Sequence, residues 1–473
     1  MKVYLINPPI YLTTKENRMN VIKDILFFNS PPLGLSYIAA VLLQNGIDVK
    51  ILDAPLEHIG IHETIEKIKA YSPDIIGLSI LTNSFNMSVS LAKQIKADYR
   101  DVPVVVGGPH INADPEGTMN VPEFDYAISG EGEYPMLKLA NALSSKSSLS
   151  GIKGLMYRQD GKVINGEKCE FISDLDELPF PARQLLKLRK YKPIPNDERK
   201  LPKIQMVSSR GCPYGCIFCD KNVFGRKYRS NSPEYVVTEI EEVVKKYKAG
   251  DIAFVESNFT ANPVRVERIC DLLLKKDFKI GWTCSLHAST MTKELLKKMK
   301  SAGCWRVRVG IESGSQKVLD FIQKGITLEQ VKNVVTWADE LGLQPKGFLM
   351  VGHLIDTQQT IEDSINFVKT IPLHDLTFQI NTPMYNTPQY HMYKDYGRFE
   401  VEGKIDFTYW QPTFIPNGMT KEKLLYYHRK GYREFYLRPA LIKRHLKQIK
   451  SIKDLNRYFR GFKLLLKLFF SSR

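Results

Sequence analysis

Residues 203–219 read KIQMVSSRGCPYGCIFC, in which a short β-type run leads directly into three closely spaced cysteines. Thiolates favour zinc or iron–sulfur centres, and Cys212, Cys216 and Cys219 could hold three corners of a four-iron cluster while the fourth iron stays open to another ligand. A structural zinc site needs a fourth Cys or His nearby, and residues 220–269 contain neither. The spacing therefore favours an iron–sulfur site at the end of a strand.

The sequence around this segment alternates between short β-branched runs and amphipathic helical stretches. Six runs predict strands: Lys203–Val207, Ile252–Val255, Lys279–Thr283, Arg306–Val309, Gly347–Val351 and Leu376–Ile380. Helical patterns separate them at Glu234–Lys246, Val264–Leu274 and Lys293–Met299. This alternation predicts a partial (βα)6 version of the parallel α/β barrel over residues 201–380, with its chemistry at the carboxyl ends of the strands.

An earlier alternation, over residues 1–145, predicts a separate α/β domain. Its strand candidates are Val3–Ile6, Val49–Leu52, Ile75–Ile80, Val104–Val106 and Tyr126–Ile128. Strands that alternate with helices in this way predict a doubly wound, Rossmann-like parallel sheet, which binds ligands where its strands end.

An aromatic residue, Phe218, precedes the last of the three cysteines, and CxxxCxxC with that residue resembles the signature of the radical S-adenosylmethionine (SAM) superfamily. The resemblance implies one [4Fe–4S] cluster, with SAM on the open iron as the source of a 5′-deoxyadenosyl radical. The stretch GIESG at 310–314 resembles the family's fourth-strand segment, and Glu256 lies where relatives commonly carry an Asp-Asp pair. The implied SAM contacts are Phe218, Glu256, Gly310, Glu312 and Ser313; a buried ion pair is the alternative role for Glu312.

The N-terminal domain resembles the cobalamin-binding domains that precede many radical SAM cores. The resemblance rests on PPLGLSY at 31–37, PDIIGLS at 73–79 and VGGPH at 106–110. Glycines in such segments let the backbone approach the corrin and its nucleotide tail. The implied cobalamin contacts are Leu33, Gly34, Ser79, Gly107, Gly108, His110, Gly130 and Glu131.

The lower face of the cobalt is expected to lack a histidine ligand. Many cobalamin domains carry Asp-x-His-x-x-Gly after the first strand, whereas residues 29–34 here read NSPPLG. This matches the radical members of the family. His110 is expected near the nucleotide tail or the domain interface, and an ordinary loop histidine is its alternative role.

Composition limits the class of protein. A chain of 473 residues suggests about two to four domains, and 43% hydrophobic with 25% charged residues is typical of globular proteins. The seven cysteines and the absence of a secretory leader argue against a disulfide framework. No apolar stretch reaches the roughly 18 residues of a membrane span, so a cytoplasmic protein is expected. The predicted parts are residues 1–145, a linker over 146–200, the core over 201–380, an aromatic-rich region over 381–440 and a tail over 441–473.

The tail is strongly basic. It holds ten Lys or Arg and one Asp, in a chain whose net charge is +16. Apolar residues recur in it at steps of three and four: Ile442, Leu446, Ile449, Ile452, Leu455, Phe459, Phe462, Leu466 and Phe469. The pattern predicts a basic amphipathic helix that either lies in an anionic membrane interface, as a peripheral contact, or packs its apolar stripe on the barrel. Nucleic acid is disfavoured as a partner because no recognition motif accompanies the charge.

The resemblance implies an enzyme. We expect a cobalamin-dependent radical SAM enzyme that methylates an unactivated carbon of a small hydrophobic molecule or lipid, with flavodoxin or ferredoxin as electron donor. Oxidation, cyclisation or rearrangement without methyl transfer is the alternative, and a non-enzymatic scaffold is disfavoured by the intact cysteine triad. One cluster is expected, because no cysteine precedes Cys169 and none follows Cys304. No residue is assigned as the catalytic acid, base or nucleophile.

Overall fold

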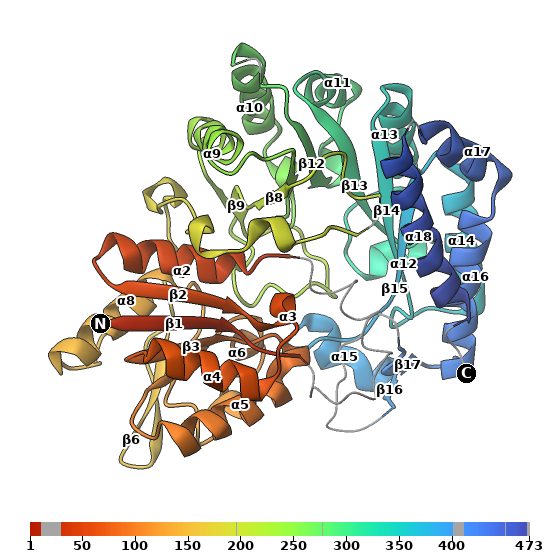
Figure 1. Cartoon of the computed structure of the whole chain (residues 1–473). Coiled ribbons are helices and arrows are strands. Elements are labelled where there is room, and N and C mark those ends of the chain that lie inside the picture. Colours follow the sequence, from red (N-terminus) through yellow and green to blue (C-terminus); the bar gives the residue numbers. More distant parts are fainter. Residues whose placement is uncertain (11–29, 195, 277, 401–410, 450, 471–473) are drawn as a thin grey trace. The chain divides into compact units, whose positions relative to one another are not determined.

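The computed structural model describes residues 1–10, 30–194, 196–276, 278–400, 411–449 and 451–470, except for the side chains of residues 453, 457 and 464–470. The chain divides into two compact units (Figure 1). Met1–Lys192 and Lys221–Gly225 form the first unit, and Pro193–Asp220 and Arg226–Arg473 form the second. The first unit therefore extends well beyond the predicted boundary at residue 145.

The first unit is built on a sheet of strand order β2-β1-β3-β4-β5-β6-β7. Its parallel strands are β1 (Lys2–Asn7), β2 (Asp48–Asp53), β3 (Ile75–Ser79), β4 (Val104–Gly107) and β5 (Tyr126–Ile128). These are the five strands predicted from the sequence, and the prediction of a doubly wound parallel sheet is confirmed. The order reverses between β1 and β3, which is where such sheets open a crevice for ligands at the carboxyl ends of their strands.

Helices cover both faces of this sheet because each presents one apolar side to it. Two hydrophobic cores result, one on each face. Helices α4 (Ile61–Tyr71) and α5 (Phe85–Asp98) contribute Ile65, Ile68, Leu91 and Ile95 to the first core. Helices α2 (Leu33–Gln44) and α8 (Glu133–Ser145) contribute to the second core.

Residues 146–200 were expected to form a linker with a hairpin around Asp160-Gly161. Residues 155–165 form a hairpin of β6 (Leu155–Gln159) and β7 (Lys162–Asn165), and β6 pairs antiparallel with β5. The hairpin covers the unpaired backbone groups that β5 would otherwise expose at the edge of the sheet. Leu155 and Met156 are buried, which ties the hairpin into the first unit.

The second unit contains a six-stranded parallel sheet in the order β15-β14-β13-β12-β11-β8. The strands are β8 (Lys203–Met206), β11 (Asp251–Phe254), β12 (Gly281–Leu286), β13 (Cys304–Glu312), β14 (Gln344–Val351) and β15 (Asp375–Ile380). All six were predicted, although β12 begins two residues later than expected. Strands β8 and β15 are the two edges, so the barrel is open, as predicted.

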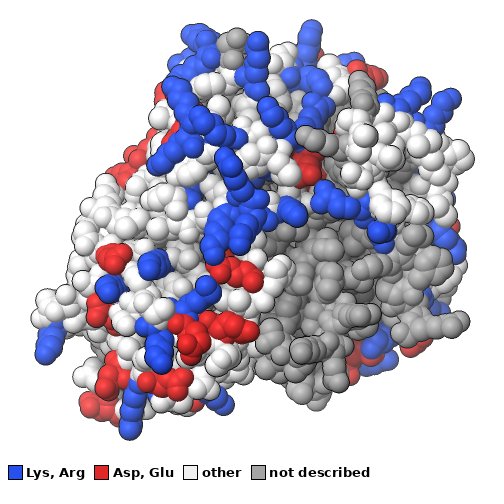
Figure 2. Space-filling view, viewed as in Figure 1, with Lys and Arg blue, Asp and Glu red and all other residues white. Residues whose placement is uncertain are grey.

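Helices separate the strands of this sheet (Figure 1). They are α9 (Pro233–Lys245), α10 (Pro263–Lys275), α11 (Lys293–Ser301), α12 (Gln316–Phe321), α13 (Leu328–Glu340) and α14 (Gln358–Thr370). Helix α9 shows how the sequence begins such a helix. Ser232 Oγ caps it by accepting a hydrogen bond from Tyr235 N. Pro233 occupies the first turn, where its missing N–H costs nothing. Figure 2 shows Lys and Arg side chains gathered in the upper part of the view, where Figure 1 places α9, α10 and α11.

The C-terminal part of the second unit is irregular and then helical. Its elements are α15 (Pro388–Tyr396), β16 (Gly397–Phe399), β17 (Phe414–Pro416), α16 (Lys421–Tyr436), α17 (Pro439–Gln448) and α18 (Ile452–Phe470). The tail is thus two helices, not the single helix predicted over 441–473. The predicted stripe positions Leu466 and Phe469 have side chains outside the described residues. Among the helices searched in the described residues, none is long and apolar enough to cross a membrane.

Buried charges occupy the amino ends of the barrel strands. Arg306 Nη1 lies 3.2 Å from Asp375 Oδ2 and 3.4 Å from Asp197 Oδ1, and Arg308 Nη2 lies 2.9 Å from Asp197 Oδ2. Burial alone would raise the pKa of Asp197, but Arg308, Lys203 and their cationic neighbours hold it well below its usual value. Asp197 therefore stays ionised and neutralises cationic side chains that lie near the amino ends of the strands.

Replacing Asp197 by Asn should destabilise the protein by about 3–5 kcal/mol, because Arg306 and Arg308 would lose a buried counter-charge. Urea unfolding at neutral pH measures the effect. Glu340→Gln is the control, because its ion pair with Lys293 is about half exposed at both side chains and should be worth at most about 1 kcal/mol. Equal stability of the two variants would contradict a structural role for Asp197.

Candidate functional site

The three cysteines lie on a loop at the carboxyl end of β8. Its amino end is held by β9 (Ser209–Arg210), which pairs antiparallel with β10 (Arg229–Ser230). Cys216 is buried, Cys212 and Cys219 are partly exposed, and all three are outside any disulfide. Cys219 N donates a hydrogen bond to Cys216 O at 3.4 Å, so the backbone folds the last two cysteines into one turn.

Contacts from the barrel hold this loop in place. Ile217 N donates to Ile322 O at 3.1 Å, and Gln389 N donates to Ile217 O at 3.2 Å. The ring of Phe218 meets the buried ring of His353 edge to face, with 5.9 Å between centroids. The structure therefore gives Phe218 a packing role beside the cysteines.

A buried ion pair lies next to the cysteines. Lys324 Nζ is 3.0 Å from Glu312 Oε1, and both side chains are about nine-tenths buried. Burial would lower the pKa of Lys324, but Glu312, Cys216 and Cys219 raise it, and the net shift is upward. Lys324 therefore remains a cation that faces both a carboxylate and two prospective thiolate ligands. Sequence reasoning missed this residue, because nothing local marks a lysine after a short helix as part of the site.

The backbone of the GIESG segment is shaped around this ion pair. Glu312 ends β13 with a φ of 64°, an uncommon conformation for a residue with a side chain. A Cβ at Gly310 would lie 2.5 Å from Glu312 Oε1 and 2.8 Å from Lys324 Nζ, so a larger residue there would push the ends of these two side chains aside. Ser313 Oγ lies 3.1 Å from Ser364 Oγ, which anchors the segment to α14. A buried ion pair was the alternative role expected for Glu312, and the structure contains this ion pair.

Polar atoms without partners also collect where the strands end. Glu256 Oε1 accepts a hydrogen bond from Ser208 Oγ at 2.6 Å, while its Oε2 has no hydrogen-bond partner among the described residues. The same holds for Asn258 Nδ2 and His353 Nδ1, which follow β11 and β14. Burial raises the pKa of Glu256 to about 7. Buried polar groups are rarely left unpaired, so these atoms fit a polar ligand such as the amino-acid and ribose parts of SAM.

His287, to which the sequence assigned no role, forms a wall of the site. Its ring stacks on Tyr214 with 3.5 Å between centroids, Nδ1 lies 2.7 Å from Ser289 Oγ, and Nε2 lies 3.1 Å from Lys324 O. Burial lowers its pKa to about 4, so the ring is neutral at physiological pH. Both ring nitrogens have partners within the chain, and the residue positions Tyr214 and Lys324.

In the first unit, the predicted cobalamin contacts Ser79, Gly107 and Gly108 meet at the ends of β3 and β4. Ser79 and Gly107 are register partners. Gly108 has a φ of 106°, and a Cβ there would lie 2.9 Å from Ile80 O. Glycine is therefore required at this position, because its backbone has a left-handed conformation and packs closely against the backbone of Ile80.

His110 lies beside these glycines. His110 N donates to Ile80 O at 3.1 Å, Nδ1 lies 3.2 Å from Thr82 Oγ1, and the ring packs against Phe85 with 4.2 Å between centroids. Nε2 has no hydrogen-bond partner in the described part of the chain. Burial lowers the pKa of His110, so its ring is neutral and Nε2 is available to a ligand of this edge.

The remaining predicted contacts are less closely gathered. Gly130 N donates to Asn112 Oδ1 at 2.7 Å, and buried Glu131 accepts a hydrogen bond from Ile172 N at 2.7 Å. Glu131 therefore ties residue 172 to the domain. Leu33 and Gly34 begin α2, where a Cβ at Gly34 would meet no atom within 4 Å. Asn29, part of the stretch that lacks a histidine, lies outside the described residues.

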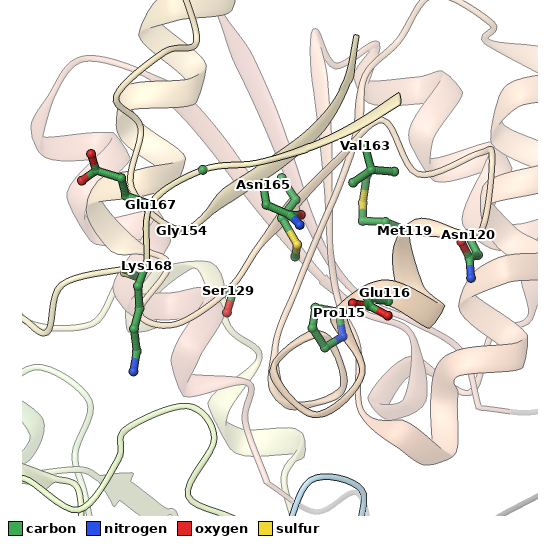
Figure 3. A pocket seen from close by; sticks show the side chains of 13 residues that line it. Pro115, Glu116, Met119, Asn120, Ser129, Gly154, Val163, Asn165, Glu167 and Lys168 are labelled. Carbon is green, nitrogen blue, oxygen red and sulfur yellow. The ribbon is translucent and has the colours of Figure 1, made fainter. Parts of the chain in front are cut away.

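A pocket of about 440 Å³ opens elsewhere in this unit, between α7 (Pro115–Met119) and the β6–β7 hairpin. Glu116, Ser129, Asn165 and Cys169 are among the residues that line it (Figure 3). None of the residues predicted to contact cofactors lines this pocket.

Comparison with known proteins identifies two domains in the chain. The B12 binding domain family model matches residues 20–140, and the Radical SAM superfamily model matches residues 206–368. An uncharacterized methyltransferase of Pyrococcus horikoshii is 33% identical over 93% of this chain and 94% of its own length. The chain therefore belongs to the radical SAM superfamily, among the enzymes in which a B12-binding domain precedes the radical SAM domain.

Two further comparisons define the range of relatives. The anaerobic magnesium-protoporphyrin IX monomethyl ester cyclase of Rubrivivax gelatinosus is 27% identical, with 88% of this chain and 75% of the cyclase covered. The structure of OxsB, a cobalamin-dependent SAM radical enzyme with aqua-cobalamin and SAM bound, superposes with a TM-score of 0.75. It is 18% identical, with 99% of this chain and 72% of OxsB covered. At that identity the superposition shows the shared fold.

Replacing Glu256 by Gln should change how stability depends on pH. The folded-state pKa of Glu256 is about 7, above the usual 4.5. The protonated carboxyl group of the wild type therefore stabilises the fold fully below pH 4.5. This stabilisation is lost as the pH rises through 7. The variant should therefore gain on the order of 3 kcal/mol on the wild type between pH 5 and pH 8. Urea unfolding across this range measures the gain. Glu267→Gln, at an exposed position on α10, should follow the wild type, and a Glu256→Gln curve parallel to both would contradict the buried, protonated carboxyl.

Proposed function

We propose that this chain is a cobalamin-dependent radical SAM methyltransferase that acts on an unactivated carbon of a hydrophobic substrate. The observation that carries the proposal is the placement of Cys216 and Cys219 beside Lys324 and Glu312 at the carboxyl end of the barrel. Similarity over nearly the whole chain to a protein named as a methyltransferase supports methyl transfer.

The cofactors would be held by residues that the structure places at the two carboxyl edges. Cys212, Cys216 and Cys219 would bind three irons of one [4Fe–4S] cluster and leave the fourth for SAM. Glu256, Asn258 and His353 offer SAM polar atoms that have no partner among the described residues, and His110, beside Gly108, offers cobalamin a ring nitrogen that likewise has none. When bound, the cluster and SAM supply a carbon-centred radical, and methylated cobalamin supplies the methyl group.

The protein's own contribution is to position the cysteines and to shield the reactive centre from water. Lys324 keeps a positive charge beside the cysteines, which favours their thiolate forms. The neutral ring of His287 and the side chain of Phe218 enclose the loop with aromatic surface. Such an enclosure keeps water and other hydrogen donors away from a reactive centre.

Radical chemistry without methyl transfer is the second candidate. The similarity to a protein named as a cyclase favours it, because that relative covers 88% of this chain. In either case we propose a small hydrophobic molecule or lipid as substrate, flavodoxin or ferredoxin as electron donor, and a cytoplasmic location with contact to a membrane.

Product analysis tests the proposal. Protein reconstituted anaerobically with iron, sulfide and hydroxocobalamin is given SAM and a reductant, and 5′-deoxyadenosine and S-adenosylhomocysteine are quantified. We expect both products from the wild type and from Cys169→Ala, whose cysteine lies in the first unit. Loss of any one of Cys212, Cys216 or Cys219 should abolish 5′-deoxyadenosine, because a cluster ligand is removed.

The product pattern separates the candidates. Deoxyadenosine without S-adenosylhomocysteine would favour cyclisation or oxidation over methyl transfer. Absence of both products, in protein that also binds no iron, would contradict both enzyme proposals.

A further inference from the structure

Helix α17 buries one apolar residue, Leu441, and otherwise packs through polar side chains. Arg444 Nη1 donates to Pro372 O at 3.1 Å, and its Nη2 lies 3.2 Å from Asp339 Oδ2. His445 Nε2 lies 2.9 Å from His374 O. On the same helix Ile442 is 44% exposed and Leu446 is 62% exposed. The polar residues thus make the contacts with the barrel, and these two apolar residues face solvent.

Helix α18 is oriented in the same way. Ile452 is 78% exposed, and Leu455, Phe459 and Phe462 are each 53–54% exposed. Steps of three, four and three residues place these four side chains on one face of the helix. The polar residues of α18 contact the rest of the unit: Tyr458 Oη donates to Gln448 Oε1 at 2.6 Å, and Arg460 Nη2 lies 3.5 Å from Glu198 Oε1.

Together these side chains form an exposed apolar ridge, which consists of Ile442, Leu446, Ile452, Leu455, Phe459 and Phe462. An amphipathic helix on a globular protein normally buries its apolar face, and both helices here expose most of the described apolar residues on it. Exposed aliphatic and aromatic residues gathered on two successive helices mark a surface that binds a partner.

The charge around the ridge decides which partner fits. Lys443 and Lys447 on α17 and Lys463 on α18 are exposed, and the sequence over 441–473 holds ten basic residues against one Asp. A second copy of this chain would present the same positive charge and be repelled. An anionic lipid surface complements both the apolar residues and the cations.

We propose that α17 and α18 form an interfacial anchor that binds anionic membranes, with the ridge inserted among the lipids and Lys443, Lys447 and Lys463 at the headgroups. A surface-lying anchor accords with the finding that none of the helices searched in the described residues is able to span a bilayer. The anchor holds the enzyme where lipids and other hydrophobic molecules are concentrated. It does not depend on which reaction the barrel performs.

Vesicle co-sedimentation of the full-length protein tests the anchor. The probes are phosphatidylcholine vesicles with and without phosphatidylglycerol. We expect the wild type to sediment with the anionic vesicles, less with neutral ones, and less at high salt. The triple variant Leu455→Glu, Phe459→Glu, Phe462→Glu should bind at least about tenfold more weakly, because three apolar contacts with lipid are lost.

Two further variants sharpen the test. Val264→Glu places the same charge on α10, where Val264 is 75% exposed, and should bind as the wild type does. Replacing Lys443, Lys447 and Lys463 by Gln should weaken binding to anionic vesicles by about fivefold per lysine, with little effect on neutral vesicles. These lysines are exposed, so this variant tests the anchor without disturbing the fold.

Three results would overturn the proposal. The first is a wild type that does not sediment with anionic vesicles. The second is equal loss of binding in Val264→Glu and in the triple variant. The third is a wild-type dimer, seen by light scattering, that the triple variant converts to monomers while vesicle binding is absent, which would assign the ridge to a second copy of the chain.

Discussion

The buried ion pair between Lys324 and Glu312 joins the parts of the barrel on which the chemistry depends. It links the end of β13 to the chain after α12, and Lys324 also faces Cys216 and Cys219. Removing either charge would leave the other buried without a partner, at a cost of several kcal/mol. The ends of both side chains lie where a Cβ of residue 310 would be, and Glu312 itself has a left-handed backbone conformation. The ion pair itself joins residues only 12 positions apart, whereas its electrostatic influence reaches the cysteine loop, about a hundred residues earlier in the sequence.

The two ends of the parallel barrel strands carry different kinds of residues. Charges that support the fold lie near the amino ends, and the residues of the candidate site lie at the carboxyl ends. Asp197, Arg306 and Asp375 form a charge network near the amino ends, and its charges are largely compensated within the protein. At the carboxyl ends Glu256, Asn258 and His353 each keep a polar atom that has no hydrogen-bond partner among the described residues. A fold whose strands all run in one direction gathers these side chains from separate βα units at one edge. The first unit follows the same rule, with Gly108 and His110 at the edge where β3 and β4 end.

Sequence reasoning succeeded where the signal is local. β-Branched runs marked the parallel strands of both sheets, and cysteine spacing singled out the loop at 212–219, whose role as a cluster site stays a prediction. The hairpin around Asp160-Gly161 was expected, but its addition to the sheet was not, because an antiparallel addition to a parallel sheet breaks the βα rhythm. Lys324 was missed because its role arises from contacts with Glu312 and the cysteine loop that form only on folding. For the tail, periodicity identified which face is apolar, but the contacts of Arg444 and Tyr458 with the barrel unit show which face packs.

The central claim is that the loop from Cys212 to Cys219 holds a cluster with one iron open to SAM. Electron paramagnetic resonance of the reconstituted, reduced protein tests it directly, with spectra recorded before and after SAM is added. The account predicts the signal of a [4Fe–4S] cluster whose shape changes when SAM binds the open iron. It also predicts that the signal is lost when the three cysteines are replaced by alanine. A signal that SAM leaves unchanged, or one that persists without these cysteines, would contradict the account.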